Sequence, residues 1–324
     1  MTIVQPVLKS LTHKRYGESM IFDTHTHYDD EAYDADREAV ILRQRENGVG
    51  LIVACGADME SSNAALKLAE DHEYIYAAVG IHPDNIGQLI SGRGLSEKDG
   101  STEDTAATRE IPEQDELAEG TAATREIPEQ NRSTDEAVTE WLRAAALHPK
   151  CRAIGEIGLD YHWDVHPRQL QQVGFKAQWR LARELNLPVV IHSRDAAEDT
   201  LNIVREMYEE YRSSGTEFRA DMHCYSYSAE LAEEYIRMGM YFGIGGVLTF
   251  KNAKKLIASV GKIPMDRILL ETDCPYLAPE PYRGSRNESS HLKGVVGKLA
   301  EIKGFSGEEI EKITYENARR FYGI

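Results

Sequence analysis

The sequence predicts an α/β protein in which eight short parallel strands alternate with helices. Eight apolar runs of strand length recur along the 324-residue chain, most of them without polar alternation, as in strands covered on both faces. Amphipathic segments with apolar residues at helical spacing lie between them. No glycine-rich phosphate turn follows the first strand, which disfavours the alternative of an open doubly wound sheet. We therefore expect a single closed (β/α)8 TIM barrel.

The elements follow one another regularly. The expected strands lie at residues 21–24, 51–54, 75–79, 152–156, 188–192, 218–223, 240–244 and 268–272. The clearest helical segments lie at residues 32–47, 61–72, 167–186, 196–211 and 229–238. Because 41% of the residues are hydrophobic, the chain can bury one large core, and we assign residues 20–324 to one domain.

Two segments depart from this pattern. Residues 1–19 are mildly basic and unpatterned, and we expect a disordered extension without a targeting role. Residues 88–134 carry eleven acidic and five basic side chains and contain the repeat TAATREIPEQ twice, at 105–114 and 121–130. Such a segment buries too little surface to offset its ordering entropy. We expect a mobile acidic insertion that leaves the C-terminal face of the barrel and partly shades a site there.

Composition narrows the range of partners and compartments. A formal net charge of −17 argues against strong electrostatic binding to nucleic acid or to an anionic membrane. The four cysteines are scattered, as expected for reduced thiols, and no apolar run has the length of a transmembrane helix. Cys224 and Cys274 directly follow candidate ligands, and we interpret them as small core residues. We expect a cytoplasmic monomer that makes no contact with a membrane.

Polar residues with metal-ligand chemistry stand at the ends of the apolar runs. IFDTHTHY places His25 and His27 on one side of the first strand. The later strands end with Glu156, His192, His223 and Asp273. A single strand-end histidine often caps a helix or bonds to a loop. Six such residues at the same relative position, all converging on one barrel mouth, are much harder to explain in that way.

Four imidazoles and two carboxylates form a mixed nitrogen and oxygen set. This set suits Zn, Mn, Fe or Co and tolerates Mg, and it is too large for one four-coordinate ion. We therefore expect two divalent metal ions, with Mg, Mn and Zn as the candidates. Such a pair can activate a shared water for in-line displacement at phosphorus, and it attacks a carbonyl as readily.

Seven blocks in order resemble the signature of the TatD family of metal-dependent hydrolases, usually described as deoxyribonucleases. The blocks are FDTHTHYDD, GIHP, GEIGLDY, PVVIHSRDA, MHCYS, ETDCPYLAP and RGSRNE, from about residue 21 to the C-terminal part. The resemblance implies a TIM barrel with a divalent metal centre. It implies that one ion is held by His25, His27 and Asp273, that the second is held by His192 and His223, and that Glu156 bridges them. Tyr227 stands where the family usually has glycine, and it could narrow the pocket or offer a stacking surface.

Roles follow for the remaining candidates. We expect Glu156 to set the metal spacing and Asp273 to accept the proton of the attacking water, although a purely ligating role for Asp273 is equally open. Substrate contacts are assigned to His82, Arg194, Arg283 and Arg286, because a guanidinium fork suits phosphate geometry. Arg194 could equally pair with Asp195 or Glu198. His162 and Trp163 could contact a base, with core packing of Trp163 as the alternative.

Three functions are compatible with this site. We favour a metal-dependent DNase that cleaves phosphodiester bonds, and the resemblance implies 3′-5′ exonuclease-like action on single-stranded DNA. The alternative is a carbonyl hydrolase on the same dinuclear site, such as a D-aminoacyl-tRNA deacylase. A non-catalytic protein with a structural metal is disfavoured, because structural sites are normally closed and single.

Overall fold

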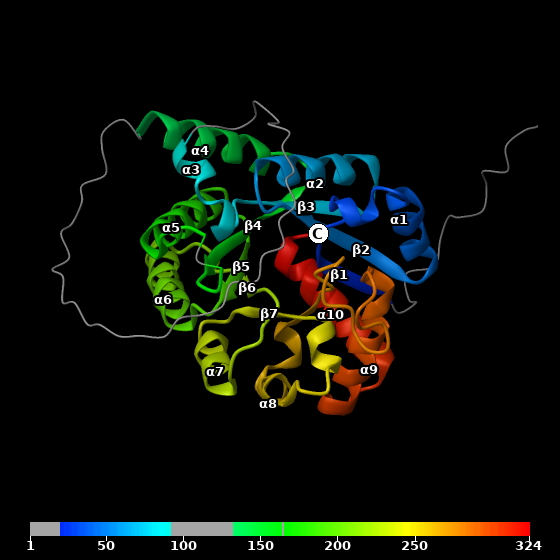
Figure 1. Ribbon diagram of the computed structural model, residues 1–324. Coiled ribbons are helices and arrows are strands. Elements are labelled where there is room, and N and C mark those ends of the chain that lie inside the picture. The colour runs from blue at the N-terminus through cyan, green and yellow to red at the C-terminus, as the bar shows by residue number, and fades with distance from the viewer. Residues whose placement is uncertain (1–19, 92–131, 164) are drawn as a thin grey trace, which may run out of the picture.

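The computed structural model describes residues 20–91, 132–163 and 165–324, and within them a parallel sheet of eight strands runs in chain order (Figure 1). The strands are β1 (Ile21–Thr26), β2 (Val49–Cys55), β3 (Ile75–Val79), β4 (Cys151–Asp160), β5 (Val189–Arg194), β6 (Ala220–Met222), β7 (Tyr241–Ile244) and β8 (Ile268–Leu270). The sheet closes where Thr26 bridges to Cys274 and the Thr24 hydroxyl donates to the Leu270 carbonyl at 3.0 Å. The predicted TIM barrel is confirmed.

Most of the helices lie around the outside of the strands, whereas the end of α10 reaches the interior of the barrel (Figure 1). The helices are α1 (Arg37–Glu46), α2 (Met59–Asp71), α3 (Gln88–Ser91), α4 (Arg132–Ala146), α5 (Arg168–Glu184), α6 (Ala197–Ser214), α7 (Ala229–Arg237), α8 (Lys254–Lys262), α9 (Leu292–Lys303) and α10 (Gly307–Tyr322). No helix in the described part of the chain combines the length and apolarity needed to cross a bilayer.

Local sequence sets several helix boundaries. Asp58 caps α2 by accepting from the Ser61 amide at 2.8 Å, and Ser306 with Glu309 forms the same reciprocal capping box at the start of α10. Gly304 ends α9 in the left-handed conformation, with φ of +72°, which glycine adopts without steric cost.

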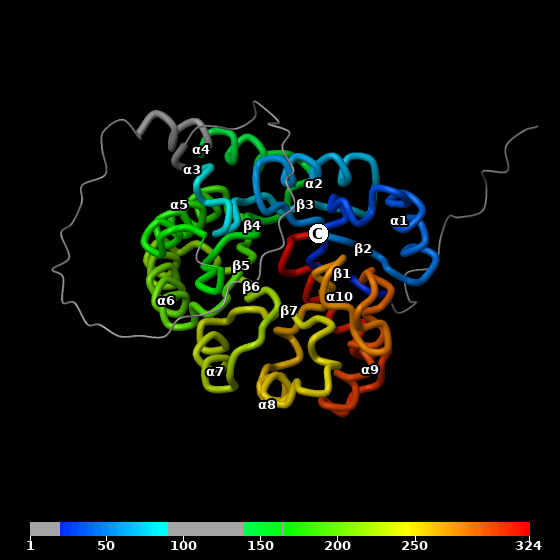
Figure 2. Tube along the Cα trace, in the orientation of Figure 1, coloured from blue at the N-terminus to red at the C-terminus, as the bar shows by residue number. Residues whose placement is uncertain are grey.

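The barrel interior is filled with apolar side chains. Phe22 of β1, Val53 of β2 and Val190 of β5 pack together with Phe321 and Tyr322 from the end of α10. Figure 2 shows how the chain passes around the barrel and returns so that its C terminus lies near the first strands. The interior is therefore largely a packed apolar core, and the histidine and carboxylate side chains cluster at the mouth formed by the strand ends.

The expected strands all form, with shifted ends. β4 runs on to Asp160, past the predicted end at Glu156, whereas β6 and β8 end earlier than predicted. The expected extension 1–19 lies outside the described residues, and so does most of the expected insertion, of which only α3 and the start of α4 are described. Disorder of these two segments stays a prediction.

Candidate metal centre

The structure brings all six predicted ligands together at the C-terminal mouth of the barrel. On one side, Nε2 of His25 lies 3.1 Å from Nε2 of His27. Oδ1 of Asp273 lies 3.3 Å from Nε2 of His27 and 3.9 Å from Nε2 of His25. Two imidazole nitrogens and a carboxylate oxygen at these separations can contact one cation.

Glu156 lies between two sets of imidazoles. Its Oε2 is 3.3 Å from Nε2 of His25 and 3.9 Å from Nε2 of His27. Its Oε1 is 2.7 Å from Nδ1 of His192 and 3.8 Å from Nε2 of His223. Each carboxylate oxygen therefore faces a different pair of histidines, which is the position that a bridging ligand requires.

The outer nitrogens of two histidines are fixed by acceptors. Nδ1 of His27 donates to the Cys55 carbonyl at 2.9 Å, and Nδ1 of His223 lies 3.0 Å from Oε2 of Glu271. A carbonyl oxygen only accepts, so a neutral His27 presents the lone pair of Nε2 to the cluster. A carboxylate on the outer nitrogen orients a metal-binding histidine in the same way. The donor set fits a divalent cation.

Sequence reasoning missed two carboxylates of the centre, Asp160 and Glu271. Oδ2 of Asp160 lies 3.0 Å from Nε2 of His192, and Glu271 contacts His223 as described above and also accepts from the Cys224 amide at 2.5 Å. Both residues are inside motif blocks, GEIGLDY and ETDCPYLAP, at or just beyond the ends of strands. A search for a strand-end carboxylate to pair with each ligand histidine would have found them.

Two glycines make room for this arrangement. Gly158 of β4 has φ of +149°, and a Cβ there would lie 1.9 Å from the backbone oxygen of His192. A Cβ on Gly243 of β7 would lie 2.1 Å from Oε2 of Glu271. Glycine at these positions allows the close approach that any larger residue would prevent.

The charge state of Glu156 is set by its neighbours. Burial by itself would raise the pKa of this carboxyl, because burial disfavours the charged form. The charges of His223 and His25 and the hydrogen bond with His192 outweigh burial and hold the pKa of Glu156 well below its usual range. Glu156 is therefore ionised at neutral pH and attracts cations.

Neighbouring carboxylates also shift the pKa values of two of the predicted ligands, His192 and His27. Burial opposes the charged form of His192, but its hydrogen bonds to Asp160 and Glu156 raise its pKa to about 9. Burial likewise opposes protonation of His27, and the Asp273 carboxylate raises the pKa of His27 to about 9. At neutral pH protons occupy nitrogens that a bound metal would take.

His82, predicted to contact substrate, also reaches the centre. It follows β3, and its Nε2 lies 3.9 Å from Oε1 of Glu156 while its ring meets the ring of His192 at a centroid distance of 4.3 Å. Burial and the neighbouring His192 lower the pKa of His82 to about 3. His82 is therefore neutral at physiological pH and can donate a hydrogen bond.

The three predicted arginines differ in their surroundings. Arg194 is exposed at the end of β5, with Cζ 5.3 Å from the centroid of the Trp163 ring. Cζ of Arg283 lies 4.3 Å from the ring centroid of Phe250. Arg286 forms a bidentate ion pair with Asp36, at 2.7 and 2.8 Å. No contact among the described residues joins Arg283 or Arg286 to the predicted ligand carboxylates.

Tyr227 supports the loops beside the mouth. Its hydroxyl lies 2.9 Å from Oγ of Ser193 and accepts from the Ala196 amide at 3.4 Å, and its ring packs against the hydrophobic core. These contacts fix the hydroxyl end of the side chain, and both roles considered for this residue stay predictions.

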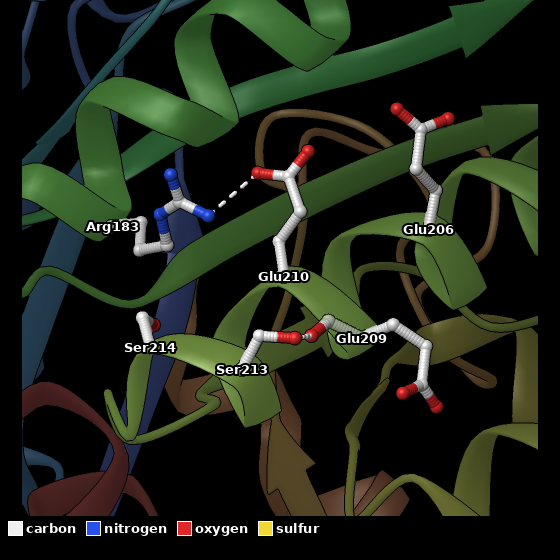
Figure 3. Close-up of a pocket in the computed structure, with 6 residues that line it drawn as sticks. All are labelled: Arg183, Glu206, Glu209, Glu210, Ser213 and Ser214. Atoms are coloured by element: carbon white, nitrogen blue, oxygen red, sulfur yellow. Dashed lines mark hydrogen bonds and ion pairs between the residues drawn. The ribbon is translucent and has the colours of Figure 1, made fainter.

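A separate hollow on the outer helices is not part of the centre. It is lined by Arg183, Glu206, Glu209, Glu210, Ser213 and Ser214 of α5 and α6 (Figure 3). These residues belong to the C-terminal halves of the two helices. Helices of such a barrel run opposite to its strands, so this hollow lies at the other end of the barrel from the strand-end histidines.

A TIM barrel whose mouth gathers histidines and carboxylates in this way is the framework of a metal-dependent hydrolase. The family model described as TatD related DNase matches residues 22–323, and the chain belongs to this family. It is 40% identical over 306 residues, 94% of this chain and 100% of the other, to a Bacillus subtilis protein described as the uncharacterized metal-dependent hydrolase YabD.

Two further proteins with TatD in their descriptions also match this chain over most of its length. An Erwinia tasmaniensis protein named 3′-5′ ssDNA/RNA exonuclease TatD is 29% identical over 310 residues, 94% of this chain and 100% of that protein. The crystal structure of YjjV, a TatD homologue from Escherichia coli, matches with a TM-score of 0.72 and 25% identity, covering 94% of this chain and 99% of that one. The protein is thus a metal-dependent hydrolase of the TatD family.

Proposed function

We propose that this hydrolase is a phosphodiesterase that removes nucleotides from the 3′ end of single-stranded DNA with two divalent metal ions. The observation that carries the proposal is the position of Glu156, whose two oxygens face different histidine pairs. The relative from Erwinia tasmaniensis, named as a 3′-5′ ssDNA/RNA exonuclease, supports the choice of substrate.

The residues divide between two ion positions. His25, His27 and Asp273 would hold one ion, His192 and His223 the other, and Glu156 would contact both. When bound, two divalent ions supply an activated water and stabilise the charge that develops on the phosphoryl and leaving oxygens. Mg, Mn and Zn all suit these donors.

Asp273 is the candidate general base. Burial would raise its pKa, but the hydrogen bond with His27 and the charges of His223 and His27 lower the pKa, so the carboxylate is ionised at neutral pH. Its Oδ1 lies 3.3 Å from the His27 nitrogen and 3.8 Å from Nε2 of His223. It therefore lies beside a histidine from each of the two proposed ligand groups and can accept a proton from an attacking water.

Substrate contacts come from the rim of the mouth. The neutral His82 imidazole can donate to a phosphoryl oxygen, and the Arg194 guanidinium offers a planar fork to a phosphate. All four cysteines are free thiols, which supports the cytoplasmic location that is part of this proposal. We also propose that the enzyme is a monomer.

The test is hydrolysis of a 5′-labelled single-stranded DNA by metal-stripped protein that is resupplied with Mg, Mn or Zn. We expect a ladder shortened from the 3′ end with the wild type and with the control Glu206→Gln on α6. Glu156→Ala should give none. If no metal restores cleavage although ions bind, the phosphodiesterase proposal fails and esters such as aminoacyl-tRNA become the substrates to test.

A further inference from the structure

An exposed tryptophan stands at the rim of the metal centre. Trp163 lies shortly after the end of β4 at Asp160 and is 60% exposed, a large exposure for so apolar a side chain. The ring of His162 meets it edge-on, with centroids 4.9 Å apart at 87°. The guanidinium of Arg194 lies over the indole, with Cζ 5.3 Å from the ring centroid. Much of the ring surface is thus open to solvent in spite of two neighbours.

The backbone of Trp163 is tied to a metal ligand. Its amide donates to Oδ1 of Asp160 at 3.2 Å, and Oδ2 of the same carboxylate lies 3.0 Å from Nε2 of His192. Asp160 is buried, and its Oδ1 also accepts from the His162 amide at 2.8 Å. Because one buried carboxylate bonds to both the loop and His192, the backbone of Trp163 is held beside the metal centre.

Arg194 keeps its charge available. Of the two carboxylates that could have paired with it, Asp195 lies 2.9 Å from Nδ1 of His162 instead, and among the described residues no carboxylate lies within ion-pair distance of Arg194. Tyr161 donates its amide to the Arg194 carbonyl at 2.9 Å, which connects the end of β5 to the loop that carries Trp163. A cation without an acidic partner is notable in a chain with a net charge of −17.

We propose that Trp163 and Arg194 form a stacking platform for a nucleobase next to the scissile phosphate of a single-stranded nucleic acid. The inference rests on the proposed function and adds the groups that would hold the substrate. An indole face accepts every base, and a stacked arginine adds a cation that can reach the adjacent phosphate. Stacking also supplies affinity that this acidic protein cannot obtain from general phosphate attraction.

The test compares two fluorescein-labelled pentanucleotides, an oligothymidylate and its abasic analogue. Both are phosphorothioate-linked to slow hydrolysis, and binding to the Mg²⁺-loaded full chain is followed by anisotropy at fixed ionic strength. We expect the wild type to favour the oligothymidylate. Trp163→Ala should weaken its binding roughly 5- to 150-fold, the range found for loss of an aromatic stacking partner, and should leave abasic binding unchanged.

Matched variants separate stacking from other causes. Trp163→Phe should retain most of the preference for bases, and Val165→Ala, which trims another exposed apolar side chain in the same loop, should have no effect. Arg194→Ala should weaken both ligands, because it removes a phosphate contact as well. Thermal midpoints equal to that of the wild type would show that the variants are folded.

The outcomes distinguish this inference from the proposed function. If the wild type cleaves DNA but binds both pentanucleotides equally, or if Trp163→Ala weakens both equally, the platform is wrong while the nuclease stands. If Trp163→Ala selectively loses oligothymidylate binding and the wild type does not cleave DNA, the stacking platform is supported and the proposed nuclease reaction is wrong. Failure of the wild type to bind either ligand would overturn the platform.

Discussion

The metal centre and the α5–α6 surface are both built from charged side chains, and they differ in their access to water. On the helices, Arg180 pairs with Glu206 at 3.0 Å and with Glu210 at 2.7 Å, and Arg183 pairs with Glu210 at 2.6 Å (Figure 3 shows the last pair). These groups are partly exposed, and cations and anions alternate. At the mouth, Glu156 is buried and surrounded by imidazoles.

The difference shows that burial of a charged group decides how strongly its environment perturbs it. Exposed ion pairs are solvated and screened, so they contribute little to stability. A buried carboxylate loses hydration and must be compensated by protons or by a metal. The neighbouring carboxylates accordingly favour protonated imidazoles and raise the pKa of His192 and of His27 to about 9. Four predictions test this contrast.

The largest effect is expected from the bridging carboxylate. Glu156→Gln keeps the shape of the side chain and removes the charge that both ion positions share. We expect hydrolysis to fall by roughly three orders of magnitude, since metal stabilisation of a transition state is worth several kcal/mol. Glu210→Gln on the outer surface is the control and should retain activity. Equal losses in the two variants would remove the distinction between the regions.

Metal uptake should depend strongly on pH. Neutral imidazole is the ligand, and below a pKa of about 9 a proton occupies His27 and His192. Apparent Mn²⁺ affinity should therefore rise with pH between 6 and 8, by about tenfold per unit for each proton displaced, and level off above 9. Calorimetry in buffers of different ionisation enthalpy measures the released protons. Uptake without proton release at pH 7 would contradict this charge assignment.

The carboxylate behind His223 should have a smaller effect. Glu271→Gln keeps an oxygen near the histidine and removes the negative charge that orients it. We expect metal affinity to fall about 10- to 100-fold, the usual cost of losing such a partner. Equilibrium dialysis against Mn²⁺ measures the change, with Glu206→Gln as the matched control. Unchanged affinity in Glu271→Gln would show that His223 needs no such support.

The smallest effect is expected on the outer helices. Arg180→Ala removes two partly exposed ion pairs. We expect the free energy of unfolding to fall by less than about 1 kcal/mol, because screening and side-chain entropy offset the attraction. Denaturant titration measures this change, and hydrolysis should equal that of the wild type. A large loss of activity would mean that the surface network communicates with the mouth.

Much of the centre could be predicted because its ligands occupy repeated local positions. A histidine or carboxylate that ends an apolar strand is visible in the sequence, and barrel closure then brings such residues together, as with His25, His192 and Asp273. The existence of all eight strands followed from the same local signal. The ends of the strands could not be predicted in this way, because pairing with neighbouring strands decides how far a strand such as β4 extends.

The remaining assignments depend on contacts between distant parts of the chain. Arg286 stands in the loop after β8, and nothing local in the sequence reveals that it pairs with Asp36, 250 residues earlier. The carboxylate partner of His223 is likewise supplied from 48 residues away, by Glu271. Segments 1–19 and 88–134 could be judged from composition alone, and that judgement stays a prediction.

Counting bound ions tests the central claim most directly. Mn²⁺ titration of metal-stripped wild type, followed by equilibrium dialysis and electron paramagnetic resonance, reports both the number of ions and their magnetic coupling. We predict two ions per chain with a coupled signal, and loss of the coupling in Glu156→Gln. A single uncoupled ion per fully active chain would contradict a centre shared through Glu156.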